Sequence, residues 1–222
     1  MIKAVLFDLD GTLVNTLSDI ALSVNYVLSG AGFPTRPTEN FKQYAGNGNY
    51  KMIERALPEE NREKELVTHL RDEFFEHYKV HCADTSKPYD GIMPLLYELR
   101  SLGIKCCIVS NKAQSMCDEI VPKVFGKDFE FDVIVGQRDD IPAKPQPHMA
   151  YVAMNEIDVN ADECFFVGDS YTDMLTGNSS GNVTVGVLWG FRDEKELSEA
   201  GARFIIKEPN EILKLLKEIN QI

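Results

Sequence analysis

The sequence has few cysteines, and none in a spacing typical of a redox or metal motif. The five, Cys82, Cys106, Cys107, Cys117 and Cys164, are odd in number, and no pair has two residues between its members. This pattern does not indicate a disulfide framework. A reactive thiol needs an accessible, electropositive setting, which nothing in the sequence announces. We therefore expect reduced thiols that mostly fill the core.

A surplus of basic residues is also lacking. Lysine and arginine total 23 against 35 aspartates and glutamates, which gives a formal net charge of −12. Binding to a nucleic-acid backbone needs clustered basic side chains, and an anionic membrane surface attracts them too. We therefore expect no nucleic-acid partner and no membrane partner. The net charge does not describe a single small site, where a bound divalent cation can reverse the local field.

Long hydrophobic runs are absent. The N-terminal stretch MIKAVLFDLD is too short for a signal peptide or a membrane span and is broken by acids, so we predict a cytoplasmic protein. Hydrophobic residues make up 44% of the 222 residues, which is an ordinary globular composition. A chain of this length can build one large core with a smaller appended domain.

Short apolar runs of strand length recur along the chain. Most are apolar on successive residues, which is typical of strands buried on both faces of a parallel sheet. The segments between them have helical spacing, and one ends at Gly103, as a helix C-cap does. This alternation predicts an α/β fold with a Rossmann-like, doubly wound, mainly parallel sheet. The runs are IKAVLFDL, IKCCIVSN, FDVIVGQ, ECFFVGD, VTVGVLWG and ARFIIKE.

One interval breaks this rhythm. From about Asn15 to Pro88 there is no convincing strand, only helical patterns with a loop, AGNGN, between them. We interpret residues 15–88 as an all-helical cap domain, inserted into a core formed by residues 1–14 and 89–222. The alternative is that these helices simply cover the sheet, but a sheet of this size rarely needs so many helices in one block.

Polar side chains gather where the predicted strands end. Sites in open parallel sheets form beyond the carboxyl ends of the strands. The first strand ends at Asp8 and Asp10, the second at Ser110 and Asn111, the third leads into Lys144, and the fourth ends at Asp169, with Asp173 in the next turn. Residues two apart on a strand point the same way, so Asp8 and Asp10 can reach one side of the site if the extended geometry persists.

So many carboxylates in one place require compensation. Neighbouring acids repel, and one protonates unless a cation is present. A hard divalent ion with oxygen ligands fits such a cluster, and Mg²⁺ is the usual choice where phosphate also binds. Each of these residues, taken alone, could instead have a purely structural role. Asp-Gly dipeptides form turns, Ser110, Asp169 and Ser170 can cap helices, and Asp173 can face a helix dipole.

Four short motifs, DLDGTL, SNK, KP and GDSYTD, occur in this order. In this respect the chain resembles the haloacid dehalogenase-like hydrolase superfamily over nearly its whole length. The resemblance implies that Asp8 is the nucleophile and forms an aspartyl-phosphate, while Asp10 is a general acid and base. Ser110 would bind a phosphoryl oxygen, and Lys144 would steady that group and the nucleophile.

The same resemblance implies the metal ligands. Mg²⁺ would be held by the Asp8 carboxylate, the Asp10 backbone carbonyl and Asp169, with Asp173 holding the waters of the metal. The acid at Asp10 favours phosphate chemistry over the dehalogenating branch, which lacks it. The cap resembles the helical C1 type of this superfamily.

Substrate choice is less clearly encoded. Segments such as YAGNGNYKMIERAL and GQRDDIPAKPQP resemble the phosphoglycolate phosphatase branch, although Asn15 stands where that branch commonly has an acid. Gly46, Asn47 and Gly48 would then meet a small phosphorylated metabolite, together with Ser110, Asn111 and Lys144. A plain turn between helices is the alternative for the glycine loop. We expect a monomer or a homodimer.

Other functions remain open at this point. A pyrophosphatase, a 5′-nucleotidase or a phosphosugar mutase could use the same scaffold. A phosphoacceptor signalling domain is the more distant alternative, although it would need neither a lid nor the acid at Asp10. His77 and His81, four residues apart, could share a helix face and hold a transition metal, but no third ligand is evident.

Overall fold

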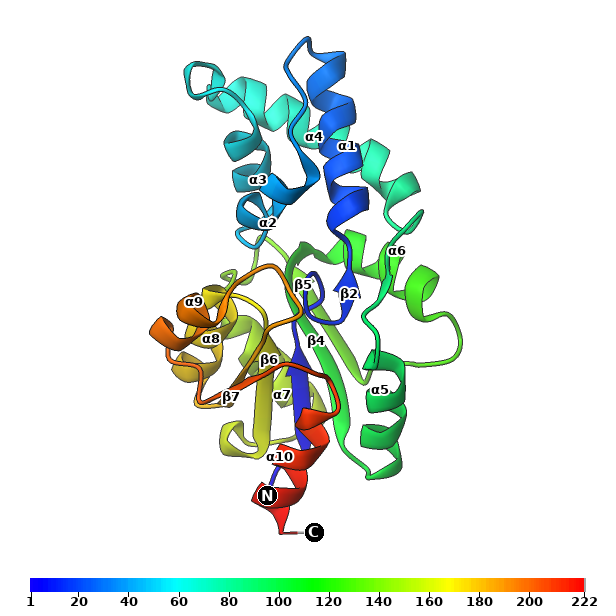
Figure 1. Ribbon diagram of the computed structural model, residues 1–222, viewed down its shortest axis with the longest axis vertical. Coiled ribbons are helices and arrows are strands. Elements are labelled where there is room, and N and C mark those ends of the chain that lie inside the picture. Colours follow the sequence, from blue (N-terminus) through cyan, green and yellow to red (C-terminus); the bar gives the residue numbers. More distant parts are fainter. Residues whose placement is uncertain (222) are drawn as a thin grey trace.

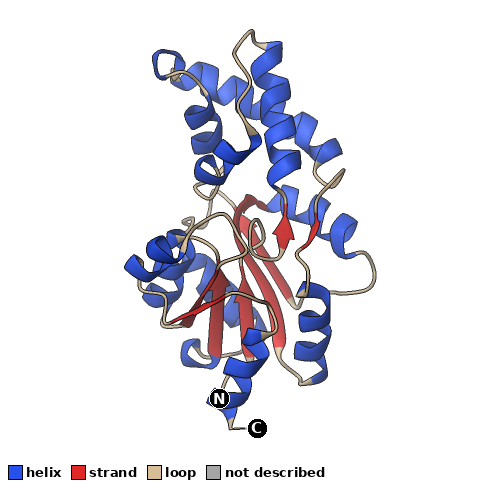
Figure 2. Ribbon diagram, viewed as in Figure 1, coloured by secondary structure: helices blue, strands red, loops and turns tan. Residues whose placement is uncertain are grey.

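A six-stranded parallel sheet forms the centre of the lower half of the molecule (Figures 1 and 2). The computed structural model describes residues 1–221. The strand order is β5-β4-β1-β6-β7-β8, and every neighbouring pair is parallel. All six predicted apolar runs are strands, which confirms the α/β class. They are β1 (Ala4–Phe7), β4 (Lys105–Ala113), β5 (Val133–Gln137), β6 (Cys164–Gly168), β7 (Val183–Val187) and β8 (Phe204–Ile206).

The central strand β1 is buried on both faces, which explains its unbroken apolar sequence. Val5 and Phe7 belong to a core shared with three helices, α5 (Ile92–Ser101), α6 (Gln114–Phe125) and α10 (Glu211–Asn220). Ala4 and Leu6 point the other way, into a core shared with α7 (His148–Ile157). The alternation of side chains along a strand thus supplies both helical layers of a doubly wound fold. The remaining elements of this half are η3 (Ala161–Glu163), α8 (Tyr171–Ser180) and α9 (Glu194–Glu199).

The upper half of the molecule is helical (Figure 2). The two long helices, α1 and α4, pack against each other, and α3 packs on α4. The block keeps its own apolar side chains buried, including Val24, Phe41, Leu70 and Phe74. The division into a core of 1–14 and 89–222 and a cap of 15–88 stays a prediction. The elements are α1 (Leu17–Gly30), η1 (Thr38–Asn40), α2 (Phe41–Tyr44), α3 (Asn49–Ala56), η2 (Glu59–Asn61) and α4 (Lys64–His81).

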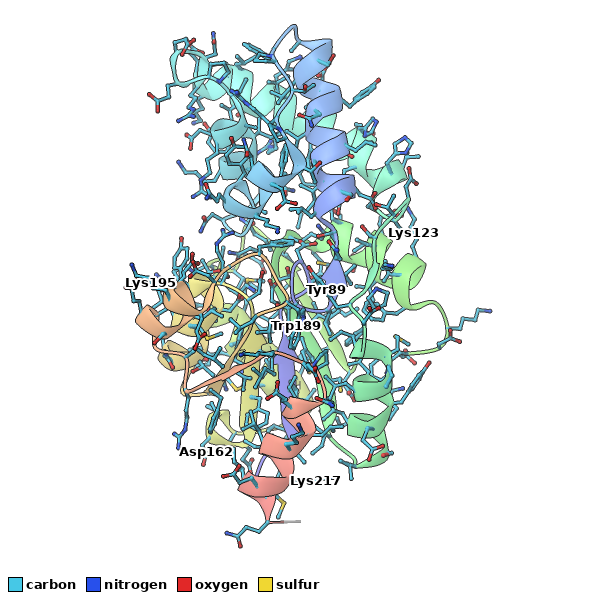
Figure 3. The ribbon with its side chains drawn as sticks, in the orientation of Figure 1. Tyr89, Lys123, Asp162, Trp189, Lys195 and Lys217 are labelled. Carbon is cyan, nitrogen blue, oxygen red and sulfur yellow. The ribbon has the colours of Figure 1, made fainter. Side chains whose placement is uncertain are left out.

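Two short strands that the sequence did not predict lie at the junction of the halves. β2 (Val14–Asn15) and β3 (Lys87–Pro88) pair antiparallel. With two residues each, they are too short to show a periodic pattern. They bring the chain entering the helical block beside the chain leaving it, at the two predicted boundaries. Trp189, labelled in Figure 3 near this level, donates from Nε1 to the carbonyl of Thr12 at 2.9 Å.

Asp19 fastens the same junction from inside α1. Its carboxylate accepts hydrogen bonds from the backbone N–H groups and the hydroxyls of Thr85 and Ser86, at 2.6–3.1 Å. Burial opposes the charged form of Asp19, but these hydrogen bonds outweigh it and hold the pKa of its carboxyl below the usual range. Asp19 therefore belongs to the structure of the junction.

The five cysteines are free and buried, as expected for thiols that fill the core. Burial raises the pKa of each, to about 12 for Cys106, Cys117 and Cys164. Over residues 1–221, no helix is sufficiently long and apolar to cross a membrane.

Candidate active site

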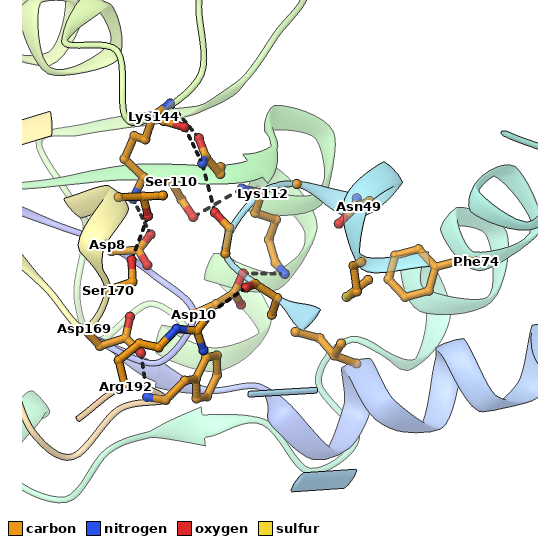
Figure 4. Close-up of a pocket in the computed structure, with 18 residues that line it drawn as sticks. Asp8, Asp10, Asn49, Phe74, Ser110, Lys112, Lys144, Asp169, Ser170 and Arg192 are labelled. Carbon is orange, nitrogen blue, oxygen red and sulfur yellow. Dashed lines mark hydrogen bonds and ion pairs between the residues drawn. The ribbon is translucent and has the colours of Figure 1, made fainter. Parts of the chain in front are cut away.

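The carboxyl ends of the central strands open into a cavity that the helical block covers (Figure 4). Asp8, Asp10, Ser110, Lys144 and Asp169 all line it, so the structure brings these predicted site residues together. Its free volume of about 40 Å³ has room for a few water molecules, since one water needs roughly 10–15 Å³. The covering side is mostly apolar and includes Ile20, Met52 and Phe74. The arrangement limits both the water and the size of molecule that the cavity admits.

Lys144 is the positive centre of the core side. Its Nζ donates to Asp8 Oδ1 at 2.9 Å, to Asp173 Oδ1 at 2.7 Å and to the carbonyl of Val109 at 2.8 Å. Lys144 and both acids are buried. Burial alone would lower the pKa of Lys144, but the carboxylates of Asp173 and Asp8 outweigh it and raise that pKa. The lysine therefore stays charged.

The charged form of Asp8 is less well stabilised than that of Lys144. The pKa of its carboxyl is raised to about 6, because burial and the charge of Asp173 together outweigh the opposing effect of Lys144. A single lysine shared between two acids leaves negative charge uncompensated. Further positive charge beside Asp8 would favour its ionised form.

Asp169 lies beside these groups without a lysine of its own. Its Oδ2 accepts from the backbone N–H of Phe191 at 2.6 Å. Burial raises the pKa of Asp169, and the negative charges of Asp173 and Asp8 raise it further. Gly11 and Gly190 pack so closely on this side chain that an added Cβ at either would lie about 2.3 Å from it. Gly11 also has a φ of +87°, so glycine is required there on both counts.

Three of these acids could hold a metal ion. One carboxylate oxygen each from Asp8, Asp169 and Asp173 lie within 4.8 Å of one another. The donors are all oxygens, and two of the three carboxyls have raised pKa values in the absence of a cation. A hard divalent cation would neutralise the repulsion between these buried carboxylates, so the residues present fit Mg²⁺. The carboxylate of Asp10 is not in this group.

Asp10 faces a different lysine. Its Oδ2 accepts from Lys112 Nζ at 2.9 Å and its Oδ1 from the hydroxyl of Thr16 at 2.7 Å. Lys112 Nζ also donates to the hydroxyl of Tyr78 on α4 at 3.2 Å. Asp8 and Asp10 thus line one cavity, as the strand pattern predicted, but each is bound by its own lysine. The sequence motif SNK contained Lys112, but nothing in it assigned the lysine a role.

Ser110 and Asn111 have different surroundings. Ser110 lines the cavity, and its Oγ accepts from the N–H of Lys112 at 3.3 Å. The amide of Asn111 accepts from the N–H of Lys144 at 2.8 Å and donates to the carbonyls of Lys144 and Gly46, both at 3.0 Å. Asn111 therefore positions the backbone that carries Lys144 and contacts the covering loop. A substrate contact from Asn111 stays a prediction.

The covering loop divides its three predicted substrate residues. Gly46 and Gly48 line the cavity, with φ angles of +103° and +83°. Asn47 does not line it, and its Nδ2 donates instead to the hydroxyl of Tyr171 on α8 at 2.8 Å. Its side chain therefore holds the loop against the core.

The helix-capping roles that the sequence offered as alternatives occur within the site itself. Ser170 caps α8, since its backbone N–H and its hydroxyl both donate to Asp173 Oδ2, at 3.0 and 2.6 Å. The other oxygen of Asp173 accepts from Lys144. One carboxylate thus caps a helix and holds the lysine.

His77 and His81 lie outside this site. Their rings stack at 4.4 Å, His77 Nδ1 is 3.0 Å from the hydroxyl of Ser23, and His81 Nδ1 is 2.7 Å from Asp84. Among residues 1–221, the group of three or more potential metal ligands is the aspartate cluster at the strand ends.

Sequence reasoning missed Arg192, which lines the cavity from the loop between β7 and α9. No motif includes it, and its position becomes meaningful only when the loop folds over Asp169. The one available signal was its place shortly after a predicted strand, where sites of open sheets form.

Comparison with known proteins identifies the family to which the chain belongs. A model of the haloacid dehalogenase-like hydrolase family matches residues 5–187. The chain belongs to this family. A phosphoglycolate phosphatase of Colwellia psychrerythraea is 29% identical over 220 residues, covering 97% of each chain. An N-acetylmuramic acid 6-phosphate phosphatase of Pseudomonas aeruginosa is also 29% identical, over 97% of this chain and 95% of its own.

A solved structure gives the same result for the fold. A protein of Haemophilus somnus, described as a predicted phosphoglycolate phosphatase, superimposes with a TM-score of 0.87 at 26% identity, over 97% of this chain and 98% of its own. The resemblance inferred from the four motifs is thereby confirmed. This family member is a phosphatase and resembles phosphoglycolate phosphatases.

Proposed function

We propose that the protein is a Mg²⁺-dependent phosphatase that hydrolyses a small phosphomonoester through a phosphorylated Asp8. The observation that carries this proposal is the three-way contact of Lys144 with Asp8, Asp173 and the Val109 carbonyl. It fixes one oxygen of Asp8 and leaves the other to attack phosphorus. Positioning and neutralisation of charge are what phosphoryl transfer chiefly requires.

The other residues have roles that follow from their contacts. Asp10 lines the cavity, and its carboxylate, which Lys112 and Thr16 hold, lies outside the group of potential metal ligands. We assign it the donation of a proton to the leaving oxygen and the later removal of one from water. Ser110 would bind a phosphoryl oxygen, and the positive charge of Lys144 would steady the phosphoryl group beside the carboxylate of Asp8. The apolar side chains of the helical block exclude bulk water from this exchange.

Asp8, Asp169 and Asp173 would hold Mg²⁺, with the backbone carbonyl of Asp10 as a further proposed contact. The ion would neutralise the acids and the phosphoryl oxygens, and so favour approach of the nucleophile. A cytoplasmic location and a monomeric or homodimeric state stay predictions.

The cavity favours a small substrate. Its free volume accommodates a few water molecules, which suits an ester the size of 2-phosphoglycolate better than a phosphorylated amino sugar acid. The names of several relatives agree with this choice, although one acts on N-acetylmuramic acid 6-phosphate. We therefore propose 2-phosphoglycolate or a similar small phosphorylated acid.

Phosphate release tests the proposal. The purified protein is incubated with Mg²⁺ and 2-phosphoglycolate, pyrophosphate, a nucleoside 5′-monophosphate or a hexose phosphate. We expect release from 2-phosphoglycolate with the highest kcat/KM. A mutase would instead convert hexose phosphate to its isomer, and no release from any monoester would refute the proposal.

The nucleophile is tested by Asp8→Asn, which keeps the shape of the side chain but removes its charge. We expect loss of release by at least ~10³-fold, because the covalent step needs a carboxylate. Asp162→Asn is the matched control, since Asp162 is an exposed acid in η3, which precedes β6 and so lies at the opposite end of that strand from Asp169. Substantial turnover by the Asp8 variant would contradict the assignment.

A further inference from the structure

Arg192 has an unusual position between the two halves of the molecule. Its Nη2 donates to the carbonyl of Ala45 in the covering loop at 3.0 Å, and its Nε lies 3.2 Å from Glu196 on α9. Only 11% of the side chain is exposed. Its third nitrogen, Nη1, is buried and has no hydrogen-bond partner within residues 1–221.

An orphaned guanidinium nitrogen is unfavourable, because a buried donor loses its contact with water and gains nothing in return. Of the buried side-chain nitrogens and oxygens in the described chain, only this atom and Thr12 Oγ1 lack a partner. Arg192 lines the cavity, whereas Thr12 does not. Figure 4 shows the Arg192 side chain extending from beside Asp169 towards Asp10. The residue that carries the unused donor therefore lines the site itself.

The two cavity lysines are committed to other groups. Lys144 makes three hydrogen bonds, which are all that an ammonium group can donate, and two of them go to acids. Lys112 is bound to Asp10 and Tyr78. Arg192 is the remaining cationic side chain among the described residues that line the cavity. Lys112 keeps one further donor, but its charge is paired with Asp10. If the substrate carries a second negative charge, Arg192 is the cation with a buried donor that has no partner in the described part of the chain.

We propose that Arg192 binds a second anionic group of the substrate, a carboxylate separated from the phosphorus by a few atoms. This proposal rests on the phosphatase function argued above and adds the residue that selects the substrate. A guanidinium offers its donors in a planar arrangement that suits a carboxylate. The small acid proposed above as the substrate carries such a carboxylate.

The contact with Ala45 gives this recognition a second consequence. The same guanidinium that faces the substrate also holds the covering loop, through Nη2. A carboxylate bound at Nη1 would fix the orientation of Arg192 and so favour the closed arrangement of the loop. A substrate with a neutral hydroxyl in that place would offer Nη1 only an uncharged acceptor, which makes a weaker hydrogen bond.

Two substrates of nearly equal size separate these effects. They are 2-phosphoglycolate and 2-hydroxyethyl phosphate, in which a hydroxymethyl group replaces the carboxylate. With the wild-type protein and Mg²⁺, we expect kcat/KM to favour 2-phosphoglycolate by about 10- to 100-fold, as for a hydrogen bond to a charged group. Arg192→Gln should remove most of this preference, because kcat/KM for 2-phosphoglycolate should fall about 10-fold further than kcat/KM for 2-hydroxyethyl phosphate, mainly through KM. Loss of the contact with Ala45 should lower both values alike.

Two further variants isolate the cause. Arg192→Lys keeps the charge and should retain part of the preference. Arg55→Gln removes an arginine of the helical block that donates only to the carbonyls of Gln43 and Tyr44 and does not line the cavity. This matched control should keep the full preference for 2-phosphoglycolate.

The outcomes distinguish failure of the Arg192 proposal from failure of the proposed phosphatase function. If Arg192→Gln lowers kcat/KM equally for both substrates, Arg192 is only a contact between the halves, and the proposal is overturned while the phosphatase function stands. Absence of any preference in the wild type overturns it as well. If the wild type releases phosphate from neither substrate nor from p-nitrophenyl phosphate, the phosphatase function fails, and this proposal with it.

Discussion

Two buried lysines serve the same cavity in different ways. Lys144 contacts only the α/β half: Asp8 after β1, Asp173 in α8 and the backbone of β4. Lys112, at the end of β4, joins Asp10 to Tyr78 of the helical block. Figure 4 shows the two pairs side by side, with Asp8 beside Lys144 and Asp10 beside Lys112.

This comparison suggests that the two lysines have different roles in the reaction. The Lys144 pair is assembled wholly within the sheet half, so it is complete whatever the position of the helical block. The Lys112 pair includes a partner from each half. We expect removal of Lys144 to affect every substrate alike and removal of Lys112 to affect the step that depends on Asp10.

Lys144→Met should have the largest effect. It leaves Asp8 and Asp173 buried without their cation, and removing one partner of a buried ion pair typically costs about 3–5 kcal/mol of stability. Turnover should fall by at least ~10³-fold on all esters, because the nucleophile and the phosphoryl group lose the same charge. Denaturant unfolding and phosphate release measure the two effects. Lys105→Met is the control, since that lysine is exposed and binds Asp132 at the opposite end of β4.

Lys112→Met should have a smaller and more selective effect. Asp10→Asn would slow esters with poor leaving groups by about 10²- to 10⁴-fold and activated aryl esters much less, as loss of a general acid does. If Lys112 positions Asp10, its variant should show the same dependence on the leaving group, with a loss of roughly 10-fold on alkyl esters. An equal loss on alkyl and aryl esters would show that Lys112 acts on the phosphoryl group instead.

Tyr78→Phe removes the hydroxyl that Lys112 contacts but keeps the ring, which stacks on Phe74 at 5.1 Å. We expect a loss of stability of about 1 kcal/mol and a change in turnover below about 3-fold, because Lys112 still binds Asp10. A change as large as that of Lys112→Met would mean that the helical block, through Tyr78, controls Asp10.

Asp19→Asn should change stability alone, since Asp19 touches neither lysine. We expect a loss of about 1–3 kcal/mol at pH 7, as four hydrogen bonds to a buried carboxylate are weakened. The pKa of Asp19 is lower in the folded state, so its contribution is present above the unfolded pKa, near 3.9, and is lost as pH falls through the folded value. The difference between variant and wild type in urea unfolding should therefore shrink below about pH 4.

The parts of the structure that could be predicted are those that local sequence encodes. Strands such as β1 and β6 are buried on both faces, so their sequences are continuous apolar runs. Asp8, Lys144 and Asp169 could be expected together because parallel strands bring their carboxyl ends to one edge. The motif order then supplied roles that spacing alone would not.

The parts that could not be predicted depend on contacts between distant segments. Lys112 meets Tyr78 across 34 residues, and Arg192 meets Ala45 across 147. Neither contact leaves a periodic trace in the sequence. The pairing of β2 with β3 was missed because two residues cannot show alternation, and the outward turn of Asn47 depends on Tyr171 of α8.

The β2–β3 pair has a mechanical consequence. Both connections between the halves run through these four residues, and Asp19 ties them again just above. Any opening of the helical block is then a swing about this single hinge. Figure 1 shows α2 and α3 on the side away from β2, so a swing about this hinge would move the loop that follows α2 off the core and break the bond from Ala45 to Arg192. Tyr78, three residues before the end of α4, lies nearer this hinge. Opening of the helical block would therefore separate Ala45 from Arg192 before it separates Tyr78 from Lys112.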